Sequence, residues 1–143
     1  MRAKDLMETD VLTLGEDDPV DAAVDRLVDR HLHGAPVVNQ AGEVVGIVSP
    51  WDLYFATMTK AEDADSDAET VTGPLRVRDI MTSPPVSATE ETEIADLCEM
   101  MYRLRIHRIP ILRGGKLAGV VSSLDICRAV ATRQRVDRGG TNE

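Results

Sequence analysis

The sequence predicts a mixed α/β (α+β) fold of two β-α-β-β-α repeats that pack sheet to sheet with pseudo-twofold symmetry. Two observations carry this prediction. Segments of the 143-residue chain recur at an offset of 73 or 74 residues, which indicates an internal duplication. In each copy, apolar residues at helical spacing alternate with short apolar runs that are typical of strands covered on both faces. One repeat alone would leave a sheet face uncovered, so the two should pack together.

The duplication is visible in three pairs of segments. The offset falls from 74 to 73 within a glycine-containing turn, where the loss of one residue is least costly. The matching segments are Lys4-Asp5-Leu6-Met7 with Arg78-Asp79-Ile80-Met81, Pro36-Val37-Val38 with Pro110-Ile111-Leu112, and Gly46-Ile47-Val48-Ser49 with Gly119-Val120-Val121-Ser122. Asp52 and Asp125 follow the last pair at the same spacing.

Each copy predicts a helix, two strands joined by a turn, and a second helix. Asp18-Pro19 and Thr92 are the expected starts of the two first helices, since short polar side chains cap helices and proline fits the first turn. Cys98 and Cys127 fall within helical patterns and are expected to be buried thiols. The expected strands are residues 36–39, 44–48, 110–113 and 116–121, and the second helices follow from Ser49 and Ser122.

The predicted domain boundaries follow from the same pattern. Residues 1–59 form the first repeat and residues 74–134 the second. Residues 60–73 are expected to be an acidic linker, because residues 60–69 hold five acidic and no large apolar side chains. Residues 135–143, which contain two adjacent glycines, are expected to be a disordered tail.

Charge and composition exclude several classes of function. The net charge of −9 would repel a polyanion, and only four residues are aromatic, so nucleic-acid binding is not expected. Residues 1–72 carry 5 basic and 16 acidic side chains and residues 73–143 carry 11 and 9, so an anionic ligand should prefer the second half. No apolar run has the length of a membrane span, and two cysteines suit a reducing compartment. We therefore expect a cytoplasmic protein without membrane association.

No catalytic constellation is visible in the sequence. It contains no nucleophile–base pattern, no phosphate-binding glycine loop and no dinucleotide fingerprint. His31 and His33 have a spacing that could bind a metal, but no cysteine or acidic cluster supports them. The sequence therefore predicts neither an enzyme nor a metal site.

The ordered set of motifs resembles a tandem pair of cystathionine-β-synthase (CBS) domains, also called a Bateman module. The set is Asp-hydrophobic-Met, a strand led by proline, and Gly-hydrophobic-hydrophobic-Ser-x-x-Asp-hydrophobic, and it occurs twice. The resemblance implies two clefts that bind adenosine-containing ligands, namely AMP, ADP, ATP or S-adenosylmethionine, with no catalytic cofactor. It also implies a homodimer that regulates a partner protein outside this chain.

The Ser-x-x-Asp motifs, Ser49 with Asp52 and Ser122 with Asp125, are the candidate ribose anchors. A carboxylate can accept hydrogen bonds from both hydroxyls of a ribose, and a helix N-terminus favours phosphate. The same spacing resembles a capping box, in which both side chains serve only the helix. Spacing by itself favours capping, whereas the family resemblance favours ribose binding by at least one aspartate, and a capping carboxylate can do both.

The residues before each strand proline distinguish the two clefts. The second copy has His107-Arg108, where an arginine can clamp a phosphate, and this pair resembles the phosphate-contacting pair of AMP-sensing members. The first copy has His33-Gly34. We therefore expect the Asp125 cleft to bind a phosphorylated nucleotide and the Asp52 cleft to be weaker, to take a less charged ligand or to be empty. Alternatively, Arg108 is a solvated charge at a strand edge.

By analogy with the family, the first strand of the other repeat completes each cleft. The expected walls are Met7, Leu12, Leu32 and Val120 for the Asp125 cleft and Met81, Val86, Ile106 and Ile47 for the Asp52 cleft. Each of these residues could instead belong to the core. Two functions remain open: a sensor of an adenosine-containing nucleotide that signals to an unknown partner, and a constitutive dimerisation module with vestigial clefts. Trp51, Tyr54 and Phe55 are expected to lie exposed and to support a dimer.

Overall fold

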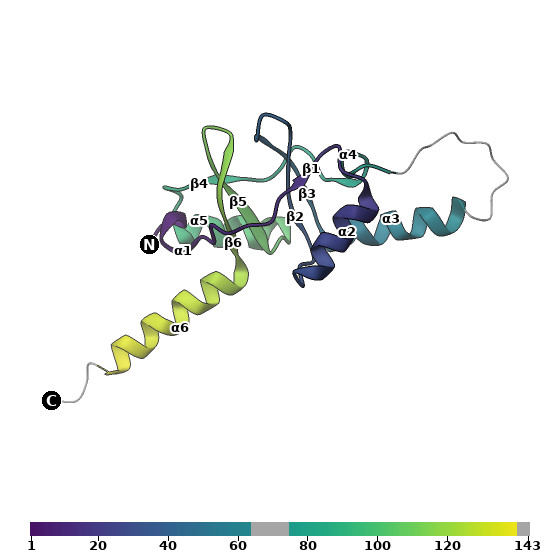
Figure 1. Cartoon of the computed structure of the whole chain (residues 1–143). Helices are drawn as coiled ribbons and strands as arrows, with labels where there is room; N and C mark the ends of the chain where they lie inside the picture. The colour runs from purple at the N-terminus through teal and green to yellow at the C-terminus, as the bar shows by residue number, and fades with distance from the viewer. Residues whose placement is uncertain (64–74, 140–143) are drawn as a thin grey trace. The chain divides into compact units, whose positions relative to one another are not determined.

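The computed structural model describes residues 1–63 and 75–139 of the chain, which contain two compact units (Figure 1). One unit spans residues 12–85 and is called here the Asp52 unit. The other combines residues 1–11 with residues 86–143 and is called the Asp125 unit. Each unit contains one three-stranded sheet, so the mixed α/β fold with two repeats is confirmed.

The Asp52 unit has strand order β1-β2-β3. Strand β1 runs parallel to β2, and β2 runs antiparallel to β3. The elements are β1 (Leu14–Gly15), α2 (Val20–Asp29), β2 (Ala35–Val38), β3 (Val44–Val48), α3 (Pro50–Asp63) and α4 (Val77–Ile80).

The Asp125 unit repeats this topology with strand order β4-β5-β6. Strand β4 is parallel to β5, and β5 is antiparallel to β6. The elements are α1 (Ala3–Leu6), β4 (Ala88–Thr89), α5 (Ile94–Leu104), β5 (Arg108–Arg113), β6 (Lys116–Ser122) and α6 (Ser123–Gly139).

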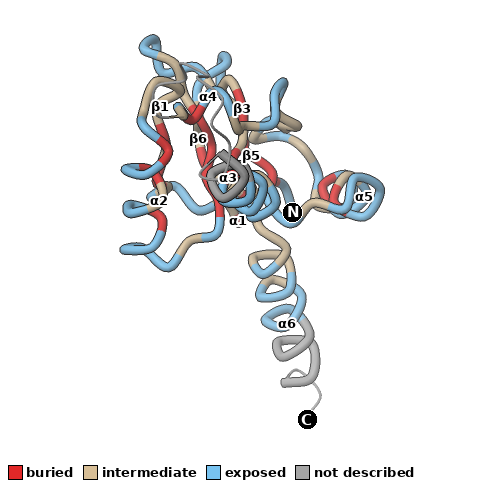
Figure 2. The backbone as a smooth tube through the Cα atoms, turned by 90° about the vertical axis from the view of Figure 1, so that its right-hand side faces the viewer, coloured by how far each residue is buried: buried red, intermediate tan, exposed pale blue. Residues whose placement is uncertain are grey.

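The buried residues follow the strands and one face of the first helix in each unit (Figure 2). In α2 the buried positions are Val20, Ala23 and Leu27, which lie on one face of a 3.6-residue helix. In α5 they are Leu97 and Met101. From Val45 to Val48 in β3 and from Ala118 to Ser122 in β6, half-buried residues alternate with buried ones, so one face of each strand lies deeper in the core.

Cys98 and Cys127 are exposed, so the expectation of buried thiols is wrong. The apolar stripe of α5 is narrower than its sequence suggests. Leu97 and Met101 are buried, and Cys98 follows Leu97 by one residue, which turns its side chain about 100° around the helix.

The two first helices begin one or two residues later than expected. Pro19 is the N-cap of α2 and Glu93 the N-cap of α5, and neither side chain makes a capping hydrogen bond. Asp18 Oδ2 instead accepts the main-chain N–H of Gly15 at 2.8 Å, and Thr92 Oγ1 accepts that of Thr89 at 3.1 Å. Both side chains therefore close the turn before the helix, as short polar side chains also do.

Two boundaries also differ from the expected ones. Helix α3 reaches Asp63, inside the expected linker of residues 60–73, and α6 reaches Gly139, inside the expected tail of residues 135–143. The α3 extension contains lysine, alanine and glutamate, which have good helix propensity. The remainder of the linker and of the tail lies outside the described residues.

The compact units do not coincide with the sequence repeats of residues 1–59 and 74–134. Short helix α1 begins the first repeat in sequence but packs in the Asp125 unit, where the N–H of Ala3 donates to the carbonyl of Thr92 at 2.8 Å. Helix α4 packs in the Asp52 unit, where the N–H of Val77 donates to the carbonyl of Asp18 at 2.9 Å. Each repeat therefore contributes its first segment to the other unit.

Candidate ligand-binding site

Ser122 and Asp125 form a complete capping box at the start of α6. Asp125 Oδ2 accepts the main-chain N–H of Ser122 at 2.8 Å, and Ser122 Oγ accepts that of Asp125 at 3.2 Å. Arg128 Nη2 lies 3.4 Å from Asp125 Oδ1, a long contact one turn along the helix. Only 17% of the Asp125 side chain is exposed, so the carboxylate is held in one orientation at the surface.

Ser49 and Asp52 form the matching box at the start of α3. Asp52 Oδ2 accepts both the main-chain N–H of Ser49, at 2.9 Å, and its hydroxyl, at 3.0 Å. Ser49 Oγ lies 3.3 Å from the main-chain nitrogen of Asp52 and accepts its hydrogen. The capping interpretation of both Ser-x-x-Asp motifs is therefore confirmed, and it leaves open whether the carboxylates also hold a ligand.

A second segment crosses the strand that leads into each box. Glu8 pairs with Val120 in the Asp125 unit, with both main-chain hydrogen bonds at 2.9 Å. Thr82 pairs with Ile47 in the Asp52 unit, with hydrogen bonds of 2.8 and 3.0 Å. These pairs add a main-chain bridge to each sheet beside the aspartate.

Glycines make this crossing possible. A β-carbon on Gly119 would lie 2.7 Å from the carbonyl oxygen of Glu8 and 2.9 Å from the Met7 side chain. A β-carbon on Gly46 would lie 2.6 Å from the sulfur of Met81. The structure thus places Met7 against the strand that holds Val120, and Met81 against the strand that holds Ile47, each within the unit of the expected aspartate.

Arg108 lies beside the Asp125 box. It is the register partner of Ser122 across β5 and β6, and the carbonyl of His107 accepts the N–H of Ser123 at 2.9 Å. Both His107 and Arg108 are exposed. The main chain therefore brings the predicted phosphate-binding pair to the first residue of α6.

His33 and Gly34 occupy the matching position in the Asp52 unit, where the environment differs. His33 is exposed, whereas Gly34 is buried. A β-carbon on Gly34 would lie 2.2 Å from the carbonyl oxygen of Val48, so no side chain fits there without a movement of the backbone. An arginine therefore does not fit at this position of the Asp52 unit with the present backbone.

Four predicted wall residues belong to the unit opposite their assigned aspartate. Leu12 is buried in the core of the Asp52 unit, and Leu32 packs against that core. Ile106 packs against the core of the Asp125 unit, and Val86 is half-buried in the same unit. The assignment of these residues to ligand walls stays a prediction.

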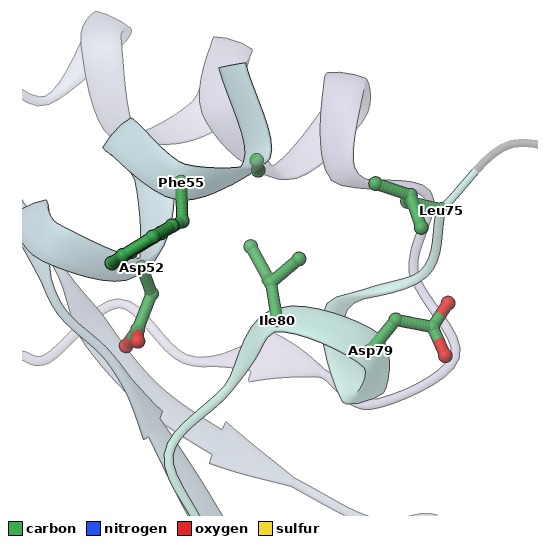
Figure 3. Close-up of a pocket in the computed structure, with 6 residues that line it drawn as sticks. Asp52, Phe55, Leu75, Asp79 and Ile80 are labelled. Carbon is green, nitrogen blue, oxygen red and sulfur yellow. The ribbon is translucent and has the colours of Figure 1, made fainter. Parts of the chain in front are cut away.

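A shallow hollow lies between α3 and α4, beside the Asp52 box (Figure 3). Its volume is about 320 Å³, and it is lined by Asp52, Phe55, Ala56, Leu75, Asp79 and Ile80. Figure 3 shows the Ile80 side chain directed into the hollow, with Asp52 and Asp79 on opposite sides of it. A matching hollow of about 330 Å³ in the Asp125 unit is lined in part by Asp5, Leu6, Asp125 and Ala129. The duplication therefore extends to the space between the helices.

Two residues near the carboxylates were missed by the sequence analysis. Thr82 Oγ1 lies 3.2 and 3.3 Å from the two carboxylate oxygens of Asp52, and Arg128 contacts Asp125. A comparison of the two copies could have indicated Thr82, because Thr82 follows Met81 at the position where Glu8 follows Met7.

The family model described as "CBS domain" matches residues 3–58 and again residues 77–132. The chain belongs to the CBS domain family. Both matches include the Ser-x-x-Asp box of their copy, so the two boxes described above are corresponding positions of a CBS pair. The expected family is therefore confirmed.

Solved CBS pairs share this fold. A crystal structure of CBSX2 in complex with AMP superposes with a TM-score of 0.80 at 24% identity, covering 93% of this chain and 98% of that one. A crystal structure of the CBS-pair protein CBSX2 from Arabidopsis thaliana gives a TM-score of 0.76 at 25% identity, with 94% of this chain and 96% of that one covered. The CBS pair of protein MJ0100, in complex with 5′-methylthioadenosine and S-adenosyl-L-methionine, gives 0.77 at 21% identity, with 93% and 98% covered.

Curated relatives include a longer enzyme. The chain is 29% identical over 128 residues to inosine-5′-monophosphate dehydrogenase from Methanocaldococcus jannaschii, and the match covers 89% of this CBS pair but 23% of the enzyme. The chain spans less than half the length of the first curated relatives that it matches.

The described part of the chain has neither a metal-binding cluster nor a membrane-spanning helix. Residues 1–63 and 75–139 contain no cluster of three or more histidine, cysteine, aspartate or glutamate side chains arranged to hold a metal ion. Within the same ranges, no helix combines the length and apolar character that crossing a bilayer requires.

Proposed function

We propose that this CBS pair is a regulatory module that binds an adenosine-containing ligand and transmits its occupancy to a partner protein. The observation that carries the proposal is the pair of capping aspartates, each fixed at a helix N-terminus beside a crossing segment. The CBS pairs of CBSX2 and MJ0100 support the choice of ligand, since their crystal structures contain AMP, 5′-methylthioadenosine and S-adenosyl-L-methionine.

The chemistry of the Asp125 box suits a ribose. A carboxylate has about four lone-pair positions on two oxygens, and the cap uses one on Oδ2. A vicinal diol can therefore donate to both oxygens at once, which gives it an advantage over a single hydroxyl. The adjoining N-terminus of α6, a 17-residue helix, favours a negatively charged group nearby.

Arg108 distinguishes the two sites in this proposal. It stands across the strand pair from Ser122 and is exposed, so its guanidinium can reach a phosphate held at the start of α6. The Asp52 site has the buried Gly34 at the same position. We therefore assign a phosphorylated nucleotide such as AMP, ADP or ATP to the Asp125 site, and a less charged adenosyl ligand or weaker binding to the Asp52 site.

The wider role follows from the family. We propose a cytoplasmic, non-catalytic homodimer whose ligand favours one conformation over another, and the size of that effect is limited by the ligand's differential affinity. In this proposal, a partner protein responds to the conformational change that the ligand induces.

Isothermal titration of nucleotide-stripped protein with AMP, ATP and S-adenosylmethionine tests this function. We expect heat from at least one ligand, and Asp125→Ala should weaken nucleotide binding. Arg108→Gly should weaken AMP far more than adenosine, because only AMP carries the phosphate. Absence of heat for all three ligands would overturn the sensor, and equal losses for AMP and adenosine would exclude a phosphate role for Arg108.

One observation favours the alternative of a constitutive dimerisation module. Trp51, Tyr54 and Phe55 are 64%, 55% and 52% exposed and contact one another on α3, with ring centroids 4.9 to 6.5 Å apart. Exposed clusters of aromatic rings are typical of protein interfaces. The expectation that these residues are exposed is confirmed.

Sedimentation equilibrium tests the dimer. Replacing Trp51 and Tyr54 together with alanine should shift the protein toward the monomer, while Tyr102→Ala, which removes a ring that is 74% exposed on α5, should not. A dimer that persists unchanged in the double variant would exclude this surface. A dimer that binds none of the ligands would favour the alternative function.

A further inference from the structure

The two capping aspartates differ in how many of their acceptor positions the protein itself fills. Oδ2 of Asp52 accepts two donors from Ser49, and the Thr82 hydroxyl lies 3.2 Å from Oδ1 and 3.3 Å from Oδ2. Of its four lone-pair positions, Asp52 therefore has one left when Thr82 donates. That position is on Oδ1, because Ser49 fills Oδ2. A diol needs two positions, and Oδ1 offers two only when the Thr82 hydroxyl does not donate to it.

Asp125 has more positions available. Its Oδ2 accepts one main-chain N–H, and its Oδ1 has only the long 3.4 Å contact with Arg128. Even when Arg128 donates, one lone-pair position remains on Oδ1 and one on Oδ2. The Arg128 side chain is also 70% exposed, whereas the main chain of Thr82 is fixed by two hydrogen bonds to Ile47. Asp125 thus keeps one acceptor position on each oxygen.

The Thr82 hydroxyl is held in place by the main chain. The N–H and carbonyl of Thr82 both bond to Ile47, which fixes the α-carbon beside the Asp52 box. The matching residue in the Asp125 unit, Glu8, is fixed in the same way to Val120. A glutamate carboxylate has no hydrogen to donate to Asp125, and Glu8 Oε1 instead accepts the N–H of Asp10 at 3.3 Å.

We propose that the Thr82 hydroxyl is an internal competitor for the ligand, occupying Asp52 in the way that a ribose hydroxyl would. This inference rests on the proposed function and adds the order in which the two sites bind ligand. A sugar diol binds first at Asp125, and the Asp52 site accepts a diol only after the Thr82 hydroxyl is displaced. The preference for the Asp125 site over the Asp52 site would hold even for an uncharged nucleoside. It is therefore independent of Arg108.

Adenosine titrations in an Asp125→Ala background test the proposal, because only the Asp52 site then remains. Thr82→Val removes the hydroxyl and keeps the shape of the side chain, and Thr82→Ser keeps a hydroxyl as the matched control. We expect Thr82→Val to bind adenosine about 3- to 10-fold more tightly than its parent, the range that one hydrogen bond of typical net strength gives. Thr82→Ser should stay close to the parent.

The outcomes separate this inference from the proposed function. Unchanged or weaker adenosine binding in Thr82→Val, in a parent that does bind, overturns the competitor role alone. If the parent binds nothing and Thr82→Val gains binding, the inference is supported. If neither protein binds adenosine although the protein with Asp125 intact does, the competitor role is overturned and the proposed function stands. The proposed function falls as well only if the protein with Asp125 intact binds none of AMP, ATP and S-adenosylmethionine. If Thr82→Val alters the thermal midpoint, Thr82→Ala serves as the second variant. It should show the same gain in adenosine affinity.

Discussion

The carbonyl oxygen of Val48 occupies the space where a side chain on Gly34 would begin, 2.2 Å from an ideal β-carbon. The corresponding residue of the other repeat, Arg108, is exposed at the start of β5. The difference between the two copies is therefore built into the backbone, and it cannot be reversed by exchanging one residue for the other.

Gly34→Ala should destabilise the protein by about 1–3 kcal/mol, the usual cost of forcing atoms into a packed site. Gly34→Arg should cost at least as much and should fail to create a phosphate site. Urea unfolding monitored by circular dichroism measures the loss. Arg108→Ala is the control, and it should change the unfolding midpoint little because its side chain is exposed. An unchanged midpoint in Gly34→Ala would contradict the steric argument.

Gly119→Ala should destabilise the protein more than Gly46→Ala. The nearest atom to a new β-carbon is the main-chain carbonyl of Glu8 at Gly119, whereas at Gly46 it is the sulfur of Met81, the flexible end of a side chain. We expect a loss of about 1–3 kcal/mol for Gly119→Ala and about 1 kcal/mol for Gly46→Ala. Thermal melts of the two variants measure the two losses in stability. A larger loss for Gly46→Ala than for Gly119→Ala would mean that the Glu8 segment moves aside easily.

The ion pair of Glu90 with Arg113 should make stability fall at low pH. Arg113 Nε and Nη2 donate to the two carboxylate oxygens of Glu90 at 2.5 and 2.7 Å, and this hydrogen bonding lowers the pKa of Glu90 from its ordinary value of 4.5. A carboxyl with a lowered folded-state pKa stabilises the fold above the unfolded value, and the contribution is lost as pH falls through the folded value.

Glu90→Gln should therefore lower the thermal midpoint at pH 7 and have little effect near pH 3. Melts of both proteins across this range measure the difference. Because the Arg113 side chain is 74% exposed, we expect 1 M salt to reduce the difference at pH 7. A difference that is the same at both pH values would show that Glu90 acts by packing and not by charge.

Cys98 should react with a thiol reagent in the folded protein. Its side chain is exposed on α5, one position beyond the buried Leu97. A Cys127→Ser variant leaves Cys98 as the single thiol, and 5,5′-dithiobis(2-nitrobenzoate) should then titrate one equivalent without denaturant. Reaction only after addition of urea would mean that α5 is covered in solution.

The sequence by itself determined the duplication, the fold class and the family, because these depend on residue order and local periodicity. The repeated Gly-hydrophobic-hydrophobic-Ser-x-x-Asp segments located both boxes, and the contrast of Arg108 with Gly34 separated them. These features can be recognised without knowing which segments are in contact in the folded protein.

Only the tertiary structure decided how each box is completed. The exchange of α1 and α4 between the units and the contact of Thr82 with Asp52 depend on how segments far apart in sequence pack together. The exposure of Cys98 depends on which face of α5 the core covers. Thr82 lies 30 residues after Asp52, and the pairing of its backbone with Ile47 is what brings its hydroxyl to the carboxylate. Periodicity along the chain carries no information on such pairings, since they arise when packing selects one register.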